Sequence, residues 1–363
     1  MKGLVSELRK YRHVFVVCDR NVEDFARQVA GIPAGAEHDG KPLLAITADE
    51  GHKTINTVMH ICRWLLEHGA DRDALVLAVG GGVTTDMAGF AACIYKRGVR
   101  YANVPTTLLS MVDAGIGGKT GVNLDDYKNL LGVIRQPEFT AIFPEALETL
   151  PEREFRSGLA EMLKTFIIKN PHHAYERTVA AFHPADTSSA AGKGQVHAPK
   201  KGAWYLHSPS ADANAVSAGL PELIQQAAAI KQEIVEKDEF ESGLRRKLNL
   251  GHTWAHAIEW WQRKVSLAGT PFTHGEAVAI GMVQAARFAE KLGIAEEPGL
   301  SARIAADLTS CGLPTELPCP QKELLPAILK DKKAEGGEIR LVLPVKIGKV
   351  VVRKIPGEEI QNL

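Results

Sequence analysis

The order of hydrophobic and polar residues divides the chain into two parts of different character. In the first part, short apolar runs at 13–18, 42–47 and 74–79 alternate with polar segments, and a helical pattern covers 53–69. Apolar strands that alternate with helices are typical of a parallel sheet covered by helices. The pattern therefore predicts an α/β domain over residues 1–145.

The pattern changes after residue 145. Helical patterns follow one another near 152–169, 222–240, 250–263, 275–291 and 322–331. In that half, 339–344 is the segment with a convincing strand pattern. We expect residues 146–363 to form a mainly α-helical domain. Small and turn-forming residues without apolar periodicity fill 182–221, which predicts a flexible surface insertion in this domain.

Composition and charge narrow the class of protein. Of the 363 residues, 45% are hydrophobic and 24% are charged, as in soluble globular proteins of about two domains. The 43 basic and 43 acidic residues cancel, so no overall field attracts nucleic acid or an anionic membrane, and an anionic ligand needs a local cluster. No apolar run approaches the roughly 20 residues of a membrane span, and charges interrupt residues 1–13, where a signal peptide is apolar. We expect a cytoplasmic enzyme.

A glycine-rich turn follows the third predicted strand. Gly80, Gly81 and Gly82 end the apolar run, and a helical segment begins there. Without Cβ atoms, this backbone can approach a diphosphate, and the N-terminus of the helix offers N–H donors and a favourable dipole. The spaced G-x-G-x-x-G motif is absent, so a tight turn without a ligand stays a possible interpretation. Asp86, early in this helix, either favours the dipole or binds the ligand.

A second stretch, at 104–129, also has the composition of a phosphate site. It contains Thr106 and Thr107, a Gly-Gly-Lys-Thr turn that ends at Thr120, and the pair Lys128 and Asn129. Glycine-rich backbone with lysine and hydroxyl side chains suits a phosphate. An ATPase is disfavoured because the first glycine of a P-loop is missing. An ordinary solvated loop is the alternative.

Three potential metal ligands lie in the second half. They are Glu161 in GLAEMLK, His252 in NLGHTWAHAIEWW and His274 in FTHGEAVAIGM. One carboxylate and two imidazoles from separate helices leave an open coordination position, as in a catalytic zinc site. His256 shares a helix face with His252, and we leave it for proton transfer or phosphate contact. Histidines that merely pack in the core are the alternative.

Other metal chemistry is disfavoured. Thr253 stands where the zinc-protease motif HExxH has its glutamate. The five cysteines are scattered and form no CxxC pair, which argues against a disulfide framework and a thiolate zinc site. Three cations and a neutral amide lie in the same half as the potential ligands, namely Lys164, Lys231, Arg245 and Asn249. Such cations predict a pocket for a small, highly anionic substrate.

Taken together, the ordered motifs resemble the 3-dehydroquinate synthase branch of the sugar phosphate cyclase family, which is related to iron-containing alcohol and glycerol dehydrogenases. The similarity runs from about residue 19 to 340. The motifs are D-x-N (Asp19, Asn21), E-x-x-K (Glu50, Lys53), GGGVTTDMAGF, YKRG, VPTTLLSMVDAGIGGKTGVN, LAEMLK, GLRRKLNLGHTWAHAIE and HGEAVAIGM.

The resemblance implies a Rossmann-like NAD-binding domain, a helical metal-binding domain and an active site in the cleft between them. It implies NAD contacts from Asp19, Asn21, Glu50, Lys53, Gly81, Gly82, Asp86, Thr106, Thr107, Lys128 and Asn129. It implies substrate contacts from Arg97, Asp113, Lys119, Lys128, Lys164, Lys231, Arg245, Asn249 and His256. It implies zinc or cobalt on Glu161, His252 and His274. Ser157 stands where asparagine is common in the family, so one NAD contact is expected to differ.

The implied reaction turns 3-deoxy-D-arabino-heptulosonate 7-phosphate into 3-dehydroquinate and phosphate in the shikimate pathway. It passes through transient oxidation by NAD, phosphate elimination, re-reduction and aldol closure. The resemblance also suggests a homodimer. Three alternatives stay open, namely a cyclase for another sugar phosphate such as sedoheptulose 7-phosphate, an NAD-linked polyol dehydrogenase, and a non-catalytic binding domain.

Overall fold

The computed structural model describes residues 2–33, 41–125, 127–183, 219–265, 270–329 and 338–361. The chain divides into two compact units, Met1–Leu150 and Pro151–Leu363. Nearly all of the predicted insertion at 182–221 lies outside the described residues. None of the described helices combines the length and the apolarity that a membrane span requires.

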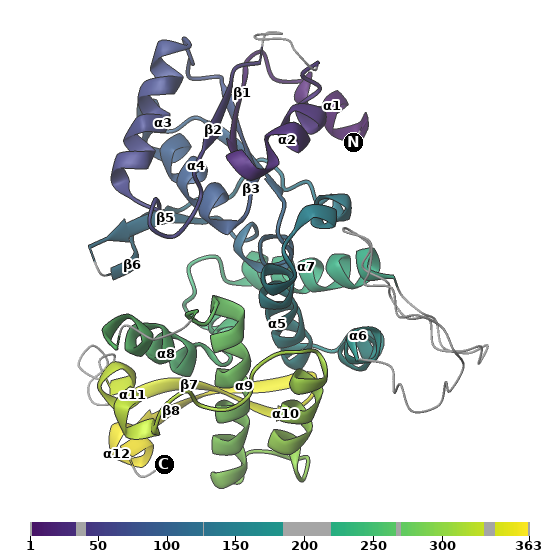
Figure 1. Ribbon diagram of the computed structural model, residues 1–363, viewed down its shortest axis with the longest axis vertical. Coiled ribbons are helices and arrows are strands. Elements are labelled where there is room, and N and C mark those ends of the chain that lie inside the picture. Colours follow the sequence, from purple (N-terminus) through teal and green to yellow (C-terminus); the bar gives the residue numbers. More distant parts are fainter. Residues whose placement is uncertain are drawn as a thin grey trace, which may run out of the picture. The chain divides into compact units, whose positions relative to one another are not determined.

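The first unit is built on a four-stranded parallel sheet (Figure 1). Its strands are β1 (Val14–Asp19), β2 (Leu43–Ile46), β3 (Leu75–Gly80) and β4 (Arg100–Pro105), in the order β2-β1-β3-β4. Its helices are α1 (Lys2–Leu8), α2 (Glu23–Ala30), α3 (Ile55–Glu67) and α4 (Gly82–Ile94). The apolar runs at 13–18, 42–47 and 74–79 are therefore confirmed as strands of a parallel sheet.

Alternate residues of the central strands bury opposite faces of this sheet. Phe15 and Val17 belong to the core beneath α3 and α4. Val14, Val16 and Cys18 belong to the core beneath α1 and α2. Because successive side chains of a strand point to opposite faces, helices on both faces explain why β1 is apolar throughout instead of alternating.

The segment that follows Gly118, for which an ordinary solvated loop was the alternative to a phosphate site, contains two strands that the sequence did not predict. It folds into an antiparallel hairpin of β5 (Lys119–Leu124) and β6 (Tyr127–Ile134). Nearly all of β6 is exposed, so no apolar alternation marks it as a strand. Gly121 faces Gly132 across the pair, and a Cβ on Gly132 would lie 2.2 Å from the Thr120 carbonyl oxygen.

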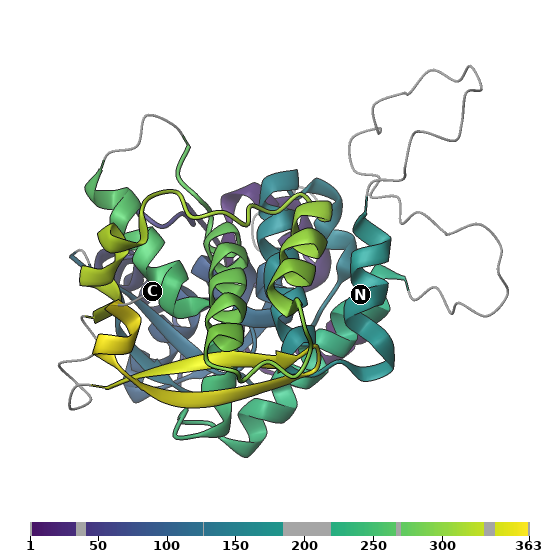
Figure 2. The same cartoon turned by 90° about the horizontal axis from the view of Figure 1, so that it is seen from below.

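The second unit is mainly helical, as predicted. Its helices are α5 (Glu152–Ile168), α6 (Ala174–Phe182), α7 (Leu220–Lys237), α8 (His252–Lys264), α9 (His274–Lys291), α10 (Leu300–Ser310), α11 (Gln321–Ile328) and α12 (Gly357–Gln361). Helix α9 is buried over most of its length and packs against α5, α8 and α10. It also contacts the hairpin β7 (Glu338–Lys346) and β8 (Lys349–Pro356), drawn in yellow in Figure 2. β8 was not predicted, because its valines at 350–352 are consecutive and the exposed Arg353 and Lys354 separate them from Ile355, so apolar and polar residues do not alternate.

Short helical turns connect these elements. They are η1 (Arg20–Val22), η2 (Tyr95–Arg97), the π-helical η3 (Ser110–Ala114), η4 (Pro144–Thr149), η5 (Pro171–His173) and η7 (Leu244–Asn249). All five cysteines are free thiols, in agreement with the absence of a disulfide framework.

Helices α8 and α9 approach each other through two glycines. Gly251, immediately before α8, has a left-handed φ of 80°. A Cβ added to Gly281 of α9 would lie 2.0 Å from the Gly251 carbonyl oxygen. Only a residue without a side chain fits at this crossing, and the crossing sets the place at which α8 begins.

We expect the substitution Gly281→Ala to destabilise the protein by about 1–3 kcal/mol, because the added methyl group meets backbone that cannot move aside. The matched control is Gly243→Ala, where a Cβ meets nothing within 4 Å. Thermal unfolding of both variants measures the difference. Equal melting temperatures would contradict the close packing of α8 on α9.

Candidate functional site

In the first unit, the residues predicted to bind a nucleotide follow the carboxyl ends of parallel strands. β1 ends at Asp19, β3 at Gly80, and β4 at Pro105 just before Thr106. Since the strands are parallel, these ends meet at one edge of the sheet. The strand order reverses between β1 and β3. In open α/β sheets, such a switch point is where ligands bind.

The glycine turn between β3 and α4 is tightly packed by the protein itself. A Cβ on Gly81 would lie 3.0 Å from the Thr107 methyl carbon, and one on Gly82 would lie 2.9 Å from the Ala114 Cβ. The Thr107 hydroxyl accepts a hydrogen bond from the Ser110 N–H at 3.1 Å. No side chain caps the N-terminus of α4. The glycines are thus required by packing, and they leave the helix N-terminus without a capping side chain.

One of the predicted nucleotide-binding residues, a buried lysine, joins two of the others. Lys53 is 5% exposed, and its ammonium donates to Asp86 Oδ2 at 2.6 Å and to Asn129 Oδ1 at 2.5 Å. Asp86 lies on α4 and Asn129 on β6, with a left-handed φ of 53°. Three separate segments are therefore held together by one charge.

Asn123 connects this lysine cluster to Glu50, and the sequence analysis assigned it no role. Its amide donates to Glu50 Oε1 at 2.9 Å, and its Oδ1 accepts from the Asn129 N–H at 2.8 Å. Its own N–H donates to the Lys53 carbonyl at 2.9 Å. The only signal in the sequence is its place inside the GGKTGVN motif.

The other predicted residues of this unit lie on several segments. The Asp19 carboxylate accepts from the Asn21 N–H at 2.9 Å, and burial raises the pKa of Asp19 although this hydrogen bond opposes the shift. Arg97 is exposed with a left-handed φ of 69° at the end of η2. Asp113 is half-buried in η3, and Lys119 and Lys128 are exposed on the hairpin.

In the second unit, three helices bring the predicted metal ligands together. Glu161 comes from the middle of α5, His252 from the first residue of α8, and His274 from the first residue of α9. Their ligand atoms all lie within 4.8 Å of one another. Glu161 Oε1 is 3.4 Å from His274 Nε2 and 3.9 Å from His252 Nε2.

The chemistry of these donors fits a divalent metal. Glu161 is fully buried, and neither of its carboxylate oxygens accepts a hydrogen bond from the described residues. The Lys164 ammonium lies 2.5 Å from Oε2 and supplies one compensating charge. Ligand atoms on a tetrahedral zinc are about 3.3 Å apart, given bond lengths near 2.0–2.1 Å. The separation of 3.4 Å between Glu161 and His274 is close to this value, and the 3.9 Å between Glu161 and His252 is somewhat wider, so a cation bound between the three side chains requires only a small inward shift.

Each histidine of this triad uses its Nδ1 atom for a hydrogen bond and turns Nε2 toward Glu161. His252 Nδ1 lies 3.2 Å from the Leu250 carbonyl oxygen, and His274 Nδ1 lies 3.0 Å from Glu259 Oε1. In a neutral imidazole, these contacts place the proton on Nδ1 and leave the lone pair on Nε2, which is the state that binds a metal. The sequence analysis did not identify Glu259.

Burial and neighbouring charges shift the pKa values of the two histidines in opposite directions. Burial and the Lys164 charge lower the pKa of His252 to about 3. Burial also lowers the pKa of His274, but the carboxylates of Glu161 and Glu259 outweigh it and raise that pKa to about 10. Burial raises the pKa of Glu161, but Lys164 and the imidazoles hold it well below its usual range. Glu161 is therefore an anion, ready to bind a cation.

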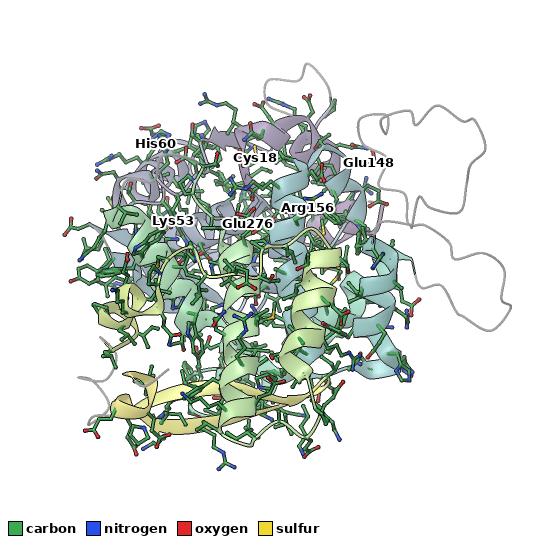
Figure 3. All side chains as sticks on the ribbon, turned by 60° about the horizontal axis from the view of Figure 1, so that its bottom comes forward. Cys18, Lys53, His60, Glu148, Arg156 and Glu276 are labelled. Atoms are coloured by element: carbon green, nitrogen blue, oxygen red, sulfur yellow. The ribbon has the colours of Figure 1, made fainter. Side chains whose placement is uncertain are left out.

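The start of α9 is anchored to α5. Thr273 caps α9 in a capping box with Glu276, and Arg153 donates to both carboxylate oxygens of Glu276, at 2.9 and 2.6 Å. Figure 3 labels Glu276 near this end of the helix. Ser157 Oγ accepts from the Gly275 N–H at 3.0 Å. Ser157 thus supports the helix that carries His274, and its predicted effect on NAD binding stays a prediction.

The cations predicted to bind the substrate in this unit lie on α5, α7 and η7. Lys231 is buried on α7 and Arg245 on η7, and η7 contacts both α7 and α5. Arg245 Nη1 donates to the Glu239 carbonyl at 2.5 Å, and Asn249 donates to Glu241 Oε1 at 2.5 Å. Asp238, at the end of α7, accepts backbone hydrogen bonds from the turn that leads into η7. This turn fixes where Arg245 stands.

His256 lies outside the triad. It is exposed on α8, one turn after His252, and the two rings meet edge to face with centroids 5.5 Å apart. The ring contact agrees with the helix face that the spacing predicts, and of the two histidines it is His252 that belongs to the triad.

Family models match most of both halves of the chain. The model described as 3-dehydroquinate synthase N-terminal matches residues 43–157, and the one described as 3-dehydroquinate synthase C-terminal matches residues 198–334. Curated relatives named 3-dehydroquinate synthase include one from Dictyoglomus thermophilum, 40% identical over 88% of this chain and 80% of its own length. The relative from Halorhodospira halophila is 40% identical over 97% of this chain and 89% of its own length.

Solved structures with the same fold include two synthases that were determined with NAD⁺ and a divalent metal. A 2-epi-5-epi-valiolone synthase from Streptomyces hygroscopicus subsp. jinggangensis, with NAD⁺ and Zn²⁺ bound, is 28% identical, has a TM-score of 0.75, and the match covers 98% of this chain and 91% of that one. A 2-deoxy-scyllo-inosose synthase complexed with carbaglucose-6-phosphate, NAD⁺ and Co²⁺ has a TM-score of 0.77 at 22% identity, over 99% and 93% of the two chains. These likenesses agree with the predicted fold class.

The two neighbouring histidines of α8 provide a test of the metal site. We expect His252→Ala to lose bound zinc after gel filtration, because one of three ligands is removed. The matched control His256→Ala should keep zinc, since this ring lies outside the triad. Elemental analysis of both variants gives the answer. Equal zinc content in the two variants would show that the metal binds elsewhere.

Asn123 provides a test of the nucleotide site. We expect Asn123→Ala to weaken NAD binding about tenfold, because two side-chain hydrogen bonds that place Glu50 and Asn129 are lost. The control Tyr95→Phe removes a buried hydrogen bond to the Ala70 carbonyl in the same unit and should leave NAD binding unchanged. Isothermal titration with NAD measures both. An unchanged dissociation constant for Asn123→Ala would remove this residue from the nucleotide site.

Proposed function

This chain belongs to the 3-dehydroquinate synthase family, and from this premise we propose that it converts 3-deoxy-D-arabino-heptulosonate 7-phosphate into 3-dehydroquinate and phosphate. The reaction is a carbon–oxygen lyase reaction of the shikimate pathway, dependent on NAD and a divalent metal. The observation that carries the proposal is the buried Glu161 carboxylate, which faces two imidazole Nε2 atoms and accepts no hydrogen bond from the described residues.

The first unit is proposed to bind NAD. Asp19, Gly81 and Thr106 follow strand ends at the edge of the sheet where a nucleotide binds. The N-terminus of α4 offers backbone N–H groups to a diphosphate. The Lys53 ammonium adds a positive charge that Asp86 and Asn129 hold in a fixed place. The supporting fact is that hydrogen bonds connect side chains from separate segments into one network, namely Lys53, Asp86, Asn129, Asn123 and Glu50.

Glu161, His252 and His274 are proposed to hold zinc or cobalt. Bound there, the metal would polarise a substrate hydroxyl, and NAD would accept a hydride and return it. The chain itself keeps the ligands ready for this. Lys164 keeps Glu161 ionised, and the Nδ1 contacts hold both imidazole rings with Nε2 directed toward Glu161.

The anionic groups of the substrate are proposed to bind the buried cations of the second unit. Lys164, Lys231 and Arg245 are each less than a tenth exposed. A buried guanidinium or ammonium attracts a carboxylate or phosphate more strongly than one in water. The heptulosonate carries both a carboxylate and a phosphate, whereas sedoheptulose 7-phosphate carries only the phosphate. Elimination releases the phosphate, so residues that bind it also stabilise the leaving group.

His256 is proposed to move protons or contact the phosphate. Its exposed ring lies beside His252, and it is outside the ligand set. An imidazole titrates near neutral pH and is therefore suited to both tasks. The proposal extends to a cytoplasmic homodimer, as the family resemblance implies.

The test is a phosphate-release assay with the heptulosonate phosphate. We expect release that requires both NAD and metal and that is lost with a chelator and restored by zinc or cobalt. No net NADH should accumulate, because the hydride returns to the product. Full activity in the chelated sample would contradict the metal-dependent mechanism.

The same assay separates the alternatives. Turnover of sedoheptulose 7-phosphate with an inert heptulosonate would show another sugar phosphate cyclase. Steady accumulation of NADH without phosphate release would show a polyol dehydrogenase. A sample that binds neither NAD nor metal would show a binding domain without catalysis.

A further inference from the structure

Glu259 is a buried carboxylate that none of the assigned roles explains. It lies on α8, two turns after His252, and is 4% exposed. A carboxylate of this burial is costly unless polar groups compensate its charge. Its Oε1 accepts from His274 Nδ1 at 3.0 Å, on the side of the ring opposite to Glu161. The His274 ring is therefore held between two carboxylates from two different helices.

The ring needs such a contact because the backbone alone does not orient it. The capping box and the contacts with Arg153 and Ser157 fix the start of α9. The His274 side chain, however, is 32% exposed, so packing encloses its ring only in part. The hydrogen bond to Glu259 selects one rotamer and puts Nε2 toward Glu161.

The two ligand histidines differ in this respect. The His252 side chain is only 13% exposed, and its Nδ1 contacts a carbonyl two residues away on its own chain segment. His274 instead depends on a side chain from another helix. A carboxylate acceptor also makes the imidazole a stronger electron donor than a carbonyl acceptor does.

We propose that Glu259 is the positioning residue that holds His274 in the rotamer and tautomer that bind the metal. This rests on the proposed metal site, of which Glu259 is not a ligand. The role predicts that changes at Glu259 alter metal affinity and the geometry of the metal while all three ligands are still present.

The experiment compares three variants of the full chain after metal removal. Glu259→Gln keeps the shape and an acceptor oxygen but not the charge, and Glu259→Leu removes both. The control is Glu290→Gln on α9, whose carboxylate binds Ser301 away from the triad. Zinc affinity is measured by competition with a chromophoric chelator, and the visible absorption spectrum of bound cobalt reports the ligand geometry.

We expect zinc affinity to fall about tenfold in Glu259→Gln and about a hundredfold in Glu259→Leu, the range found when a partner of a metal-bound histidine is removed. The cobalt spectrum should change in Glu259→Leu and stay as in the wild type in Glu290→Gln. A purely structural role would lower the melting temperature of the metal-free protein but leave the affinity of the folded protein unchanged. If the leucine variant does not fold, the glutamine variant decides.

The outcomes separate this proposal from the proposed function. Wild-type affinity and spectrum in the folded Glu259 variants would overturn the role of Glu259 and leave the metal site standing. A wild-type chain that takes up no zinc would overturn the metal-dependent function, and the role of Glu259 with it.

Discussion

The second unit depends on one costly feature, a carboxylate buried completely in the middle of a helix. Glu161 has lost all contact with water, and Lys164 supplies only one of the interactions that its oxygens lost. Replacing buried ion pairs by hydrophobic residues is often neutral or stabilising, so such a pair is weak evidence for a role in stability. A cation bound between Glu161 and the two histidines would compensate the cost of burying this carboxylate. The buried charge is then the reason that two histidines begin helices directly opposite α5.

One face of α5 organises the start of α9 at three successive levels. Arg153, Ser157 and Glu161 are spaced four residues apart and therefore share a face of the helix. They contact Glu276, Gly275 and His274 in turn. Gly275 has no alternative, since a Cβ there would lie 2.0 Å from the Ser157 carbonyl oxygen. His274, the proposed metal ligand, thus makes the last of these three contacts, and the packing of α5 against α9 fixes its position.

The sequence predicts the parts of the structure that depend on local pattern. The strands of the sheet and the long helices follow from apolar periodicity, and the three potential ligands follow from residue type and spacing. The hairpin at β6 is hidden because an exposed strand has no apolar alternation. Glu259 and Asn123 are hidden for another reason. Their partners are distant in the chain or across a helix crossing, and such contacts exist only after packing.

The two units use the same physical device for different ligands. In each, a buried lysine contacts a carboxylate, Lys53 with Asp86 at 2.6 Å and Lys164 with Glu161 at 2.5 Å. In the first unit, Lys53 also donates to Asn129, so hydrogen bonds to two segments fix the position of its charge. In the second, the carboxylate keeps lone pairs that no described residue satisfies. The lysine of the first pair is therefore held by two acceptors within the protein and fixes the place of three chain segments, whereas the second pair leaves a carboxylate that faces two imidazole Nε2 atoms, as a metal site requires.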